Sequence, residues 1–304
     1  MKRFGLGFVV CVVACALVCG HATSQQMAIT FDDLPAHGSL PPGMTRIQIA
    51  QSILATLTAQ NLPPTYGFIN AEKVAKDPET EAVLKVWRAH GQRLGNHTWS
   101  HPDINGTTAA DFDLEIQKNE PMLRKYMKGQ DWHWFRYPFL HEGDTVEKRR
   151  EVRAWLAAHQ YRLAEVNMDF EDYLWNEPYA RCMAKHDDAA IAKLHDSYLA
   201  TAEEYVGVFR HMSEMVYGRQ VKNVLLLHIG AFDAKMLPEL LTMYRAKGFH
   251  FVSLEEAETD PAYVDDPDIG DDGGGALLEQ MMEKKGLEFP VHTKPYEELE
   301  GMCR

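Results

Sequence analysis

The chain has 304 residues, 45% of them hydrophobic and 10% aromatic, which suffices for a full core and fits one large α/β domain or two small ones. It carries 31 Lys and Arg against 44 Asp and Glu, a formal net charge of −13. Because nucleic-acid binding needs a cationic surface, this balance argues against a polyphosphate partner, and we expect no nucleic acid among the partners of the chain.

Residues 1–22 have the pattern of an export signal. Lys2 and Arg3 precede an apolar run over residues 4–18, and the triplet Gly20-His21-Ala22 predicts cleavage after its alanine. Alternatively, a lipoprotein box ending at Cys15 would leave that residue lipidated and the protein tethered to a membrane. A retained membrane anchor is disfavoured, because the run is shorter than the ~20 residues that a span needs. We therefore expect a secreted, periplasmic or cell-envelope protein.

From residue 27 onward, short β-like runs alternate with amphipathic helical stretches, a pattern typical of parallel strands joined by crossover helices. The predicted strands are Met27–Phe31, Tyr66–Ile69, Gln92–Asn96, Trp134–Tyr137, Arg162–Val166, Asn223–His228 and His250–Ser253. The predicted helices are Arg46–Gln60, Glu79–His90, Ala109–Met127, Asp144–His159 and Ala234–Lys247. This count predicts a closed or nearly closed (β/α) barrel over residues 23–258, with its reactive residues at the C-terminal ends of the strands.

One crossover is much longer than the others. From Asp187 to Tyr217, apolar residues recur at steps of three and four if Ala202 fills a gap, which predicts one long helix or a helical pair. This insert, at about residues 178–220, precedes the last-but-one strand. It either shapes a substrate groove or merely packs on the barrel.

Residues 259–304 form a C-terminal extension. Its acidic, glycine-rich start, Asp265–Gly275, predicts little regular structure, and its spacing favours a solvated loop over a helix-loop-helix calcium site. Of the five cysteines, only Cys182 and Cys303 lie outside the predicted signal. In an oxidising compartment such an isolated pair is a disulfide candidate, and two free thiols are the alternative.

Five polar groups stand at or shortly after the ends of predicted strands. They are Thr30-Phe31-Asp32-Asp33, Asn96-His97-Thr98-Trp99-Ser100-His101, Phe135-Arg136-Tyr137-Pro138-Phe139, Asp169-Phe170-Glu171-Asp172-Tyr173 and Leu225-Leu226-Leu227-His228. Taken singly, each group also fits a turn, a helix cap or a packed strand. Their shared position at strand ends favours one common site.

The chemistry of these groups indicates a metal site. The adjacent carboxylates of Asp32 and Asp33 would repel unless a cation neutralises one and the other is left to accept a proton. We expect His97 and His101, four residues apart, to lie on one face of a helical turn and reach the same ion. Two histidines and one aspartate suit Zn²⁺ and leave positions for water and substrate, as a catalytic site requires. His228 would point its ring at the same mouth.

In this order and at these intervals, the five groups resemble the motifs of the NodB-type polysaccharide deacetylase family of carbohydrate esterases. The similarity runs from about Met27 to Ala257, and Lys247–Leu254 resembles the family's closing strand. The resemblance implies an α/β fold of the irregular (β/α) barrel type. It also implies a metal-dependent hydrolase that removes acetyl groups from N-acetylated sugars, such as peptidoglycan, chitin-type oligosaccharides or an exopolysaccharide.

The resemblance also assigns roles to individual residues. It implies that Asp33, His97 and His101 bind a divalent metal, Zn²⁺ in the first place and Co²⁺ or Ni²⁺ as alternatives. Asp32 would be the general base, oriented by Arg136, and His228 the general acid, held by Asp172. Leu226 would line the pocket for the acetyl methyl, the backbone N–H near Phe139 would stabilise the oxyanion, and Tyr173 would contact substrate.

Three positions depart from the family pattern. Phe139 replaces the usual tyrosine, Tyr173 replaces the usual tryptophan, and residues 229–231, which follow His228, replace the commoner acidic residue. These departures bear on the preferred sugar more than on the mechanism. His37, near the first group, is a further candidate for substrate contact, whereas Trp99 and Trp134 are expected in the core or the groove wall.

Two alternatives to N-deacetylation remain. An O-acetyl ester on xylan or a small non-sugar amide would use the same metal chemistry. A non-catalytic glycan-binding relative should have lost the base, a ligand or the acid, and Asp32, Asp33, His97, His101 and His228 are all present. The oligomeric state is left open.

Overall fold

The structure is a computed structural model that describes residues 25–270, 273–293 and 295–304. The predicted signal peptide and the lipidation alternative at Cys15 lie outside these described residues. Within the described ranges, no helix is both long and apolar enough to cross a membrane.

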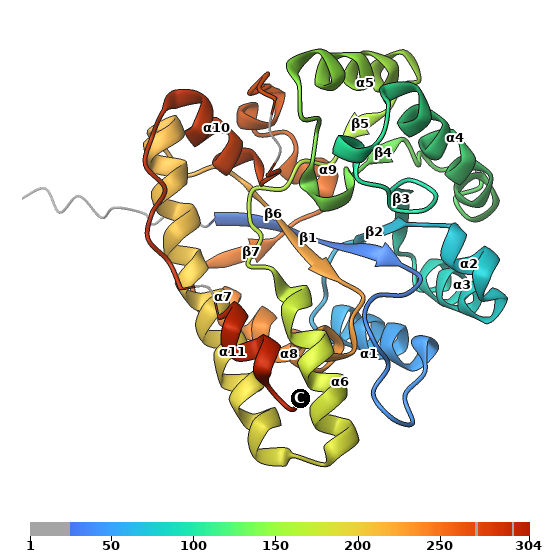
Figure 1. Ribbon diagram of the computed structural model, residues 1–304, viewed down its shortest axis with the longest axis vertical. Coiled ribbons are helices and arrows are strands. Elements are labelled where there is room, and N and C mark those ends of the chain that lie inside the picture. The colour runs from blue at the N-terminus through green and yellow to red at the C-terminus, as the bar shows by residue number, and fades with distance from the viewer. Residues whose placement is uncertain (1–24, 271–272, 294) are drawn as a thin grey trace, which may run out of the picture.

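Seven parallel strands form one curled sheet at the centre of the molecule (Figure 1). They are β1 Gln25–Leu34, β2 Tyr66–Ile69, β3 Arg93–Asn96, β4 Trp134–Phe135, β5 Arg162–Leu163, β6 Asn223–His228 and β7 Phe249–Phe251. The order is β5-β4-β3-β2-β1-β6, and β7 pairs with the first residues of β1. All seven predicted strands are present, although β4 and β5 are shorter than expected.

The sheet curls far enough to meet itself. An isolated parallel bridge joins Met168, which follows β5, to Leu225 of β6, and the Leu226 N–H donates to the Met168 carbonyl at 3.0 Å. The predicted α/β fold, an irregular (β/α) barrel, is thereby confirmed. The pairing of β1 with β6 sets Asp32 opposite His228, so these two residues share one level at the C-terminal edge of the sheet.

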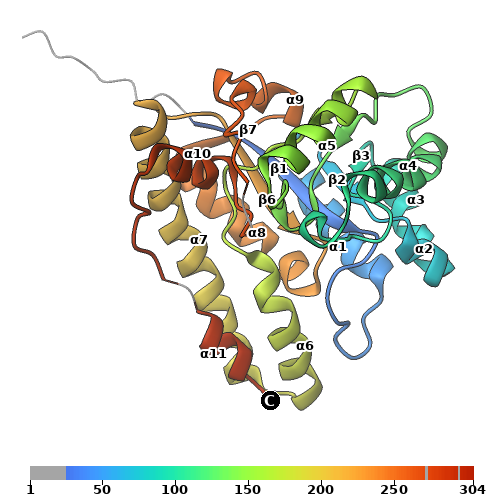
Figure 2. The same cartoon turned by 45° about the horizontal axis from the view of Figure 1, so that its top comes forward.

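Helices surround the sheet, as both views show (Figures 1 and 2). They are α1 Arg46–Ala59, α2 Glu72–Lys76, α3 Glu81–Ala89, α4 Ala109–Tyr126, α5 Val146–Ala158, α6 Asn176–Lys185, α7 Asp188–Tyr217, α8 Ala231–Ala246, α9 Leu254–Ala257, α10 Leu277–Lys285 and α11 Tyr296–Gly301. Short 3₁₀ turns are η1 Pro78–Thr80, η2 Ile104–Gly106, η3 Pro138–Leu140, η4 Asp172–Trp175 and η5 Pro261–Val264.

The long crossover consists of α6 and the single 30-residue helix α7. The Asp187 carboxylate caps the N-terminus of α7 by accepting from the Ala190 N–H at 2.9 Å. Ala202 is fully buried and does fill the gap in the apolar stripe, which runs from Leu194 to Val216. One continuous helix therefore forms because its buried face is uninterrupted.

The C-terminal extension follows α9 and wraps back over α7. Residues 265–270 and 273–276 lack regular structure as expected, but α10 and α11 follow and were not predicted. The acidic start of the extension is engaged by α5: Arg149 pairs with Asp266 at 2.9 Å, and Arg150 with Asp268 at 2.5 Å. The extension is thus fixed to the barrel by charge.

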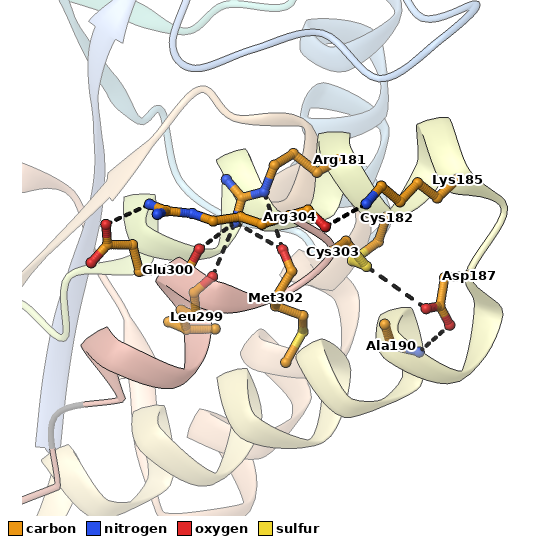
Figure 3. Close-up of a disulfide and its surroundings, with 10 residues drawn as sticks. All are labelled: Arg181, Cys182, Lys185, Asp187, Ala190, Leu299, Glu300, Met302, Cys303 and Arg304. Carbon is orange, nitrogen blue, oxygen red and sulfur yellow. Dashed lines mark hydrogen bonds and ion pairs between the residues drawn. A yellow bond between two sulfur atoms is a disulfide. The ribbon is translucent and has the colours of Figure 1, made fainter.

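A disulfide fixes the other end of the extension (Figure 3). Cys182 of α6 bonds Cys303, 121 positions later in the sequence, with an S–S distance of 2.10 Å. Beside it, the Arg181 guanidinium donates to the carbonyls of Leu299, Glu300 and Met302 (Figure 3). Of the two alternatives for this cysteine pair, the structure has the disulfide.

Two carboxyl groups near α9, those of Glu165 and Glu258, have raised pKa values. The Glu165 backbone N–H bonds the Glu258 carboxyl, and Glu258 Oε1 is buried without a hydrogen-bond partner. Burial raises the pKa of Glu165 to about 7, and burial together with Glu165 raises the pKa of Glu258 well above its usual value. Folding therefore retains protons here that the unfolded chain releases.

We expect Glu258→Gln to flatten the dependence of stability on pH. With a raised folded-state pKa, Glu258 contributes stability that is complete below its unfolded pKa near 4.5 and declines as pH rises. Urea unfolding should show that the free energy of unfolding of the variant, relative to that of the wild type, increases by roughly 1–3 kcal/mol from pH 5 to pH 8. An equal difference between the two proteins at both pH values would contradict this account.

Candidate active site

A cavity of about 570 Å³ opens at the C-terminal ends of the strands. Its lining comes from the ends of β1 and β6, from the loops after β3, β4 and β5, and from the C-terminal extension. All ten predicted site residues line it except Arg136 and Asp172, which lie directly behind it. The structure thus brings the five sequence groups together.

Asp32 and Asp33 share the cavity because the backbone breaks the alternation of the strand. Successive side chains of a regular strand point to opposite faces, whereas Asp33 has a φ of 70° and the pairing of β1 with β2 shifts register here. Both carboxylates therefore line one cavity.

The surroundings push the two carboxylates in opposite directions. Burial raises the pKa of Asp32, and the Arg136 guanidinium opposes this rise. Burial acts on Asp33 too, but Lys73, 2.8 Å from Oδ1, and His37, 2.7 Å from Oδ2, hold its pKa well below the usual value. Adjacent acids with diverging pKa values are suited to different tasks.

His97 and His101 converge, but not on a helical turn as predicted. Residues 97–101 form a loop in which Thr98 and His101 have φ values of 66° and 60°. The two rings approach to 4.8 Å between centroids. The helical expectation is therefore wrong, and left-handed backbone conformations bring the imidazoles together.

Asp33, His97 and His101 offer one donor atom each, all within 4.8 Å of one another. The His97 Nδ1–H can donate to the Arg136 carbonyl, 2.8 Å away, which leaves Nε2 free as a ligand. Burial lowers the pKa of both histidines to about 3, so both imidazoles are neutral at physiological pH. Two neutral imidazoles and a carboxylate fit a divalent metal with open coordination positions.

Buried asparagines support the histidine loop. Asn70, Asn96 and Asn119 are fully buried. The Asn70 side-chain amide donates to the backbone carbonyls of His97 and Thr98, and the side-chain oxygen Oδ1 of Asn96 accepts from the Thr98 N–H and from the Asn119 side-chain amide. This network was not predicted from the sequence, although the position of Asn70 and Asn96 at strand ends was a usable signal.

Arg136 connects several strands behind the cavity. It is 2% exposed, and its guanidinium lies 3.3 Å from both oxygens of Asp32 and 3.2 Å from Thr30 Oγ1. It also donates to the Ala164 carbonyl and lies over the Phe68 ring. These contacts hold Asp32 in a single orientation.

His228 is held by Asp172 on the opposite side of the cavity. Asp172, fully buried in η4, accepts from His228 Nδ1 and from the His228 backbone N–H, each at 2.7 Å. This double contact fixes the ring and leaves Nε2 as its other polar atom. The three cavity-lining candidates Phe139, Leu226 and Tyr173 are 56%, 4% and 38% exposed.

The remaining candidates, His37, Trp134 and Trp99, lie in different surroundings. His37 lines the cavity and its ring lies 4.6 Å from that of His228, between centroids. Trp134 is in the core, as expected, and Trp99 lies outside the cavity lining with Lys118 over its ring. Lys73, whose ammonium group contacts Asp33, had no signal in the sequence.

The extension supplies a wall of the cavity that the sequence did not predict. Phe289 and His292 line it, and Phe289 is 49% exposed. The His292 ring packs on Tyr205 of α7 at 4.9 Å between centroids, and the Tyr296 hydroxyl bonds Glu171. These contacts place the extension beside the loop after β5.

Left-handed backbone is concentrated around the cavity. Among the non-glycine residues with positive φ, the cavity lining includes Asp33, His101, Phe139, Leu140 and Glu171. Such conformations cost on the order of 1–3 kcal/mol each and persist where the surrounding structure enforces them, which is common at functional sites.

Comparison with known families identifies the first half of the barrel. Residues 20–158 match the family described as "Polysaccharide deacetylase". This segment contains Asp32, Asp33, His97, His101 and Arg136, whereas Asp172 and His228 lie beyond it.

Curated relatives agree with this match. A chitin deacetylase of Arthroderma benhamiae is 27% identical over 147 residues, 48% of this chain and 35% of that protein. A peptidoglycan-N-acetylglucosamine deacetylase of Bacillus cereus is 24% identical over 154 residues, 51% of this chain and 48% of that protein. The matched region thus spans half or less of these two relatives.

Solved structures share the fold at low identity. The chitin deacetylase of Colletotrichum lindemuthianum has a TM-score of 0.51 at 19% identity, covering 77% of this chain and 88% of that one. A CE4 family pseudoenzyme from Bacillus anthracis has a TM-score of 0.53 at 16% identity, covering 78% and 66%. Residues 20–158 are thus similar to the polysaccharide deacetylase family, and the described residues share the fold of these solved structures.

Proposed function

We propose that the chain is a metal-dependent amide hydrolase that removes acetyl groups from N-acetylated sugars. One observation carries the proposal: a single cavity is lined by a three-residue donor cluster, a carboxylate outside that cluster and a histidine that a buried aspartate holds from behind. A protein described as a pseudoenzyme shares the fold, so these side chains, and not the fold, support a catalytic function.

The donor cluster favours Zn²⁺, with Co²⁺ or Ni²⁺ as alternatives, held by Asp33, His97 and His101. When bound, such an ion would acidify water and polarise the acetyl carbonyl. Asp32, which Arg136 holds in place, is the base that accepts the proton of the attacking water. Its raised pKa supports this role, because a stronger base accepts a proton more readily.

The opposite wall of the cavity serves the leaving group. An amide cannot leave as an anion, so a proton must reach its nitrogen, and His228 Nε2 is placed to deliver it while Asp172 holds Nδ1. Leu226 borders the space for the acetyl methyl group, and the backbone N–H near Phe139 is the proposed oxyanion donor.

The substrate is proposed to be an acetylated glycan, since exposed aromatic side chains line the cavity. Phe139, Tyr173 and Phe289 each offer a partly exposed ring, and sugar rings bind to such apolar faces. The two curated relatives act, by their names, on chitin and on peptidoglycan N-acetylglucosamine. We propose a location outside the cytoplasm, supported by the export-signal pattern and the disulfide.

Separate substitutions of the adjacent acids should distinguish the base from the ligand. Asp32→Asn should keep the bound metal and lower kcat by about 10²–10⁴-fold, because it removes only the proton acceptor. Asp33→Asn should lose metal and activity together, and excess Zn²⁺ should restore part of both. Acetate release from chitin oligosaccharides, peptidoglycan, acetylated xylan and small amides is measured beside metal content.

The exposed Asp196→Asn on α7 is the matched control and should behave as wild type. Full activity of Asp32→Asn, or activity after complete chelation, would refute the proposed chemistry. Release from xylan or small amides alone would instead assign the O-acetyl or small-amide alternative. Tight glycan binding without turnover would assign the non-catalytic one.

Phe289→Ala should weaken the handling of longer glycans. Loss of one aromatic wall should lower kcat/KM for a chitin tetramer by about 2- to 12-fold and leave a small acetylated substrate unaffected. Leu114→Ala, at an exposed position of α4 outside the cavity, is the control. Equal effects on long and small substrates would show that the extension does not contact the glycan.

A further inference from the structure

A second carboxyl group lies behind the Asp172–His228 pair. Asp233, in the first turn of α8, is 1% exposed and stands outside the cavity lining. Its carboxyl group is hydrogen-bonded to that of Asp172, which is fully buried. Neither the family motifs nor the mechanism above uses this residue.

The hydrogen bonds of the two carboxyl groups differ. Asp172 uses one oxygen for His228 Nδ1 and the other for the His228 N–H, both at 2.7 Å. Asp233 accepts from the Tyr198 hydroxyl at 3.1 Å and from the Asn176 amide at 2.7 Å. Asp172 is thus oriented by His228, and Asp233 by α6 and α7.

Two carboxyl groups can bond each other only if one of them holds a proton. Burial raises the pKa of Asp172 to about 6 and, with the charge of Asp172, raises that of Asp233 well above its usual value. The N-terminus of α8 favours an anion, but by at most ~2 kcal/mol, less than the cost of burying a second charge. The proton therefore resides on Asp233.

Other titratable groups face this pair. Tyr198 of α7 and Tyr244 of α8 stand outside the cavity lining, and Asp169 lies before η4. His37 and Asp32 act on Asp172 from the cavity side.

There is no room for a side chain at position 230, which lies against Asp233 and Asn176. A Cβ added at Gly230 would stand 2.3 Å from Asp233 Oδ2 and 2.2 Å from the Asn176 amide. Only glycine leaves room for the pair at this position.

We propose that Asp233 is a positioning residue that stays protonated, donates a hydrogen bond to Asp172 and so sets how strongly Asp172 holds His228. The inference rests on the proposed function, in which His228 is the acid. While Asp233 donates its hydrogen bond, the negative charge of Asp172 is shared between the contact with Asp233 and the contact with His228. Without this hydrogen bond, that charge acts on His228 alone, and the ring should retain its proton to higher pH and release it less readily to the amide nitrogen.

Two substitutions of Asp233 distinguish the loss of its hydrogen-bond donor from a change in side-chain packing. Asp233→Leu removes the donor and should move the alkaline limb of the kcat–pH profile upward by about one pH unit while KM stays unchanged. Asp233→Asn retains an N–H donor and should restore the wild-type limb. Glu258→Gln, which removes another buried carboxyl group outside the cavity lining, is the control and should leave the limb in place.

The inference would be overturned if the alkaline limb of the kcat–pH profile did not move in Asp233→Leu. It would also be overturned if Asp233→Asn moved this limb as far as Asp233→Leu does. Infrared difference spectra of wild type minus Asp233→Asn provide a test that needs neither activity nor the leucine variant. A protonated-carboxyl band that persists at pH 8 supports the inference, and its absence overturns it. Failure of the wild type to release acetate would instead refute the proposed function, and the spectra would still decide the protonation of Asp233.

Discussion

The buried guanidinium of Arg136 is the group on which the geometry of the candidate site depends. Its side chain bonds Asp32 and Thr30 of β1 and the Ala164 carbonyl after β5, while its own carbonyl accepts from His97. One residue of the third motif thereby fixes the proposed base and one proposed ligand together. Loss of one member of such a buried pair typically costs about 3–5 kcal/mol, because the remaining charge is left uncompensated.

Burial produces opposite outcomes at neighbouring carboxyl groups in this molecule. Asp33 stays ionised because Lys73 and His37 contact it, whereas Asp32 is shifted toward the protonated form despite Arg136. On the other side of the cavity, burial raises the pKa of both Asp172 and Asp233, and the charge of Asp172 adds to the rise at Asp233. The protonation state of each carboxyl group thus depends on its immediate contacts and not on residue type.

Much of the barrel could be predicted because buried parallel strands and amphipathic crossovers leave clear periodic patterns. The strand from Tyr66 to Ile69 was predicted with its observed bounds, and α7 within one residue of its start. The left-handed conformations of Thr98 and His101 could not be predicted, since such conformations are uncommon for non-glycine residues, β-branched threonine disfavours them, and tertiary contacts enforce them. Helix α10 was missed because its apolar residues follow an acidic, glycine-rich stretch that predicts a loop.

The candidate site residues could be predicted from the sequence, whereas several residues that contact them could not. Motif order identified Asp32, Asp33, His97, His101, Arg136, Asp172 and His228, all of which the structure brings to one cavity or directly behind it. Lys73, Asp233 and the wall at Phe289 were missed, because each depends on how separate elements pack.

The position of β1 has a consequence for how the chain folds. The first described strand lies between β2 and β6, and its partners β6 and β7 arrive about 200 residues later in the sequence. Such high contact order slows folding, because a long loop must close before the central pairing forms. Asp32 therefore meets His228 only once almost the entire barrel has been synthesised, and partial products of translation would hold an unpaired, apolar edge that invites aggregation.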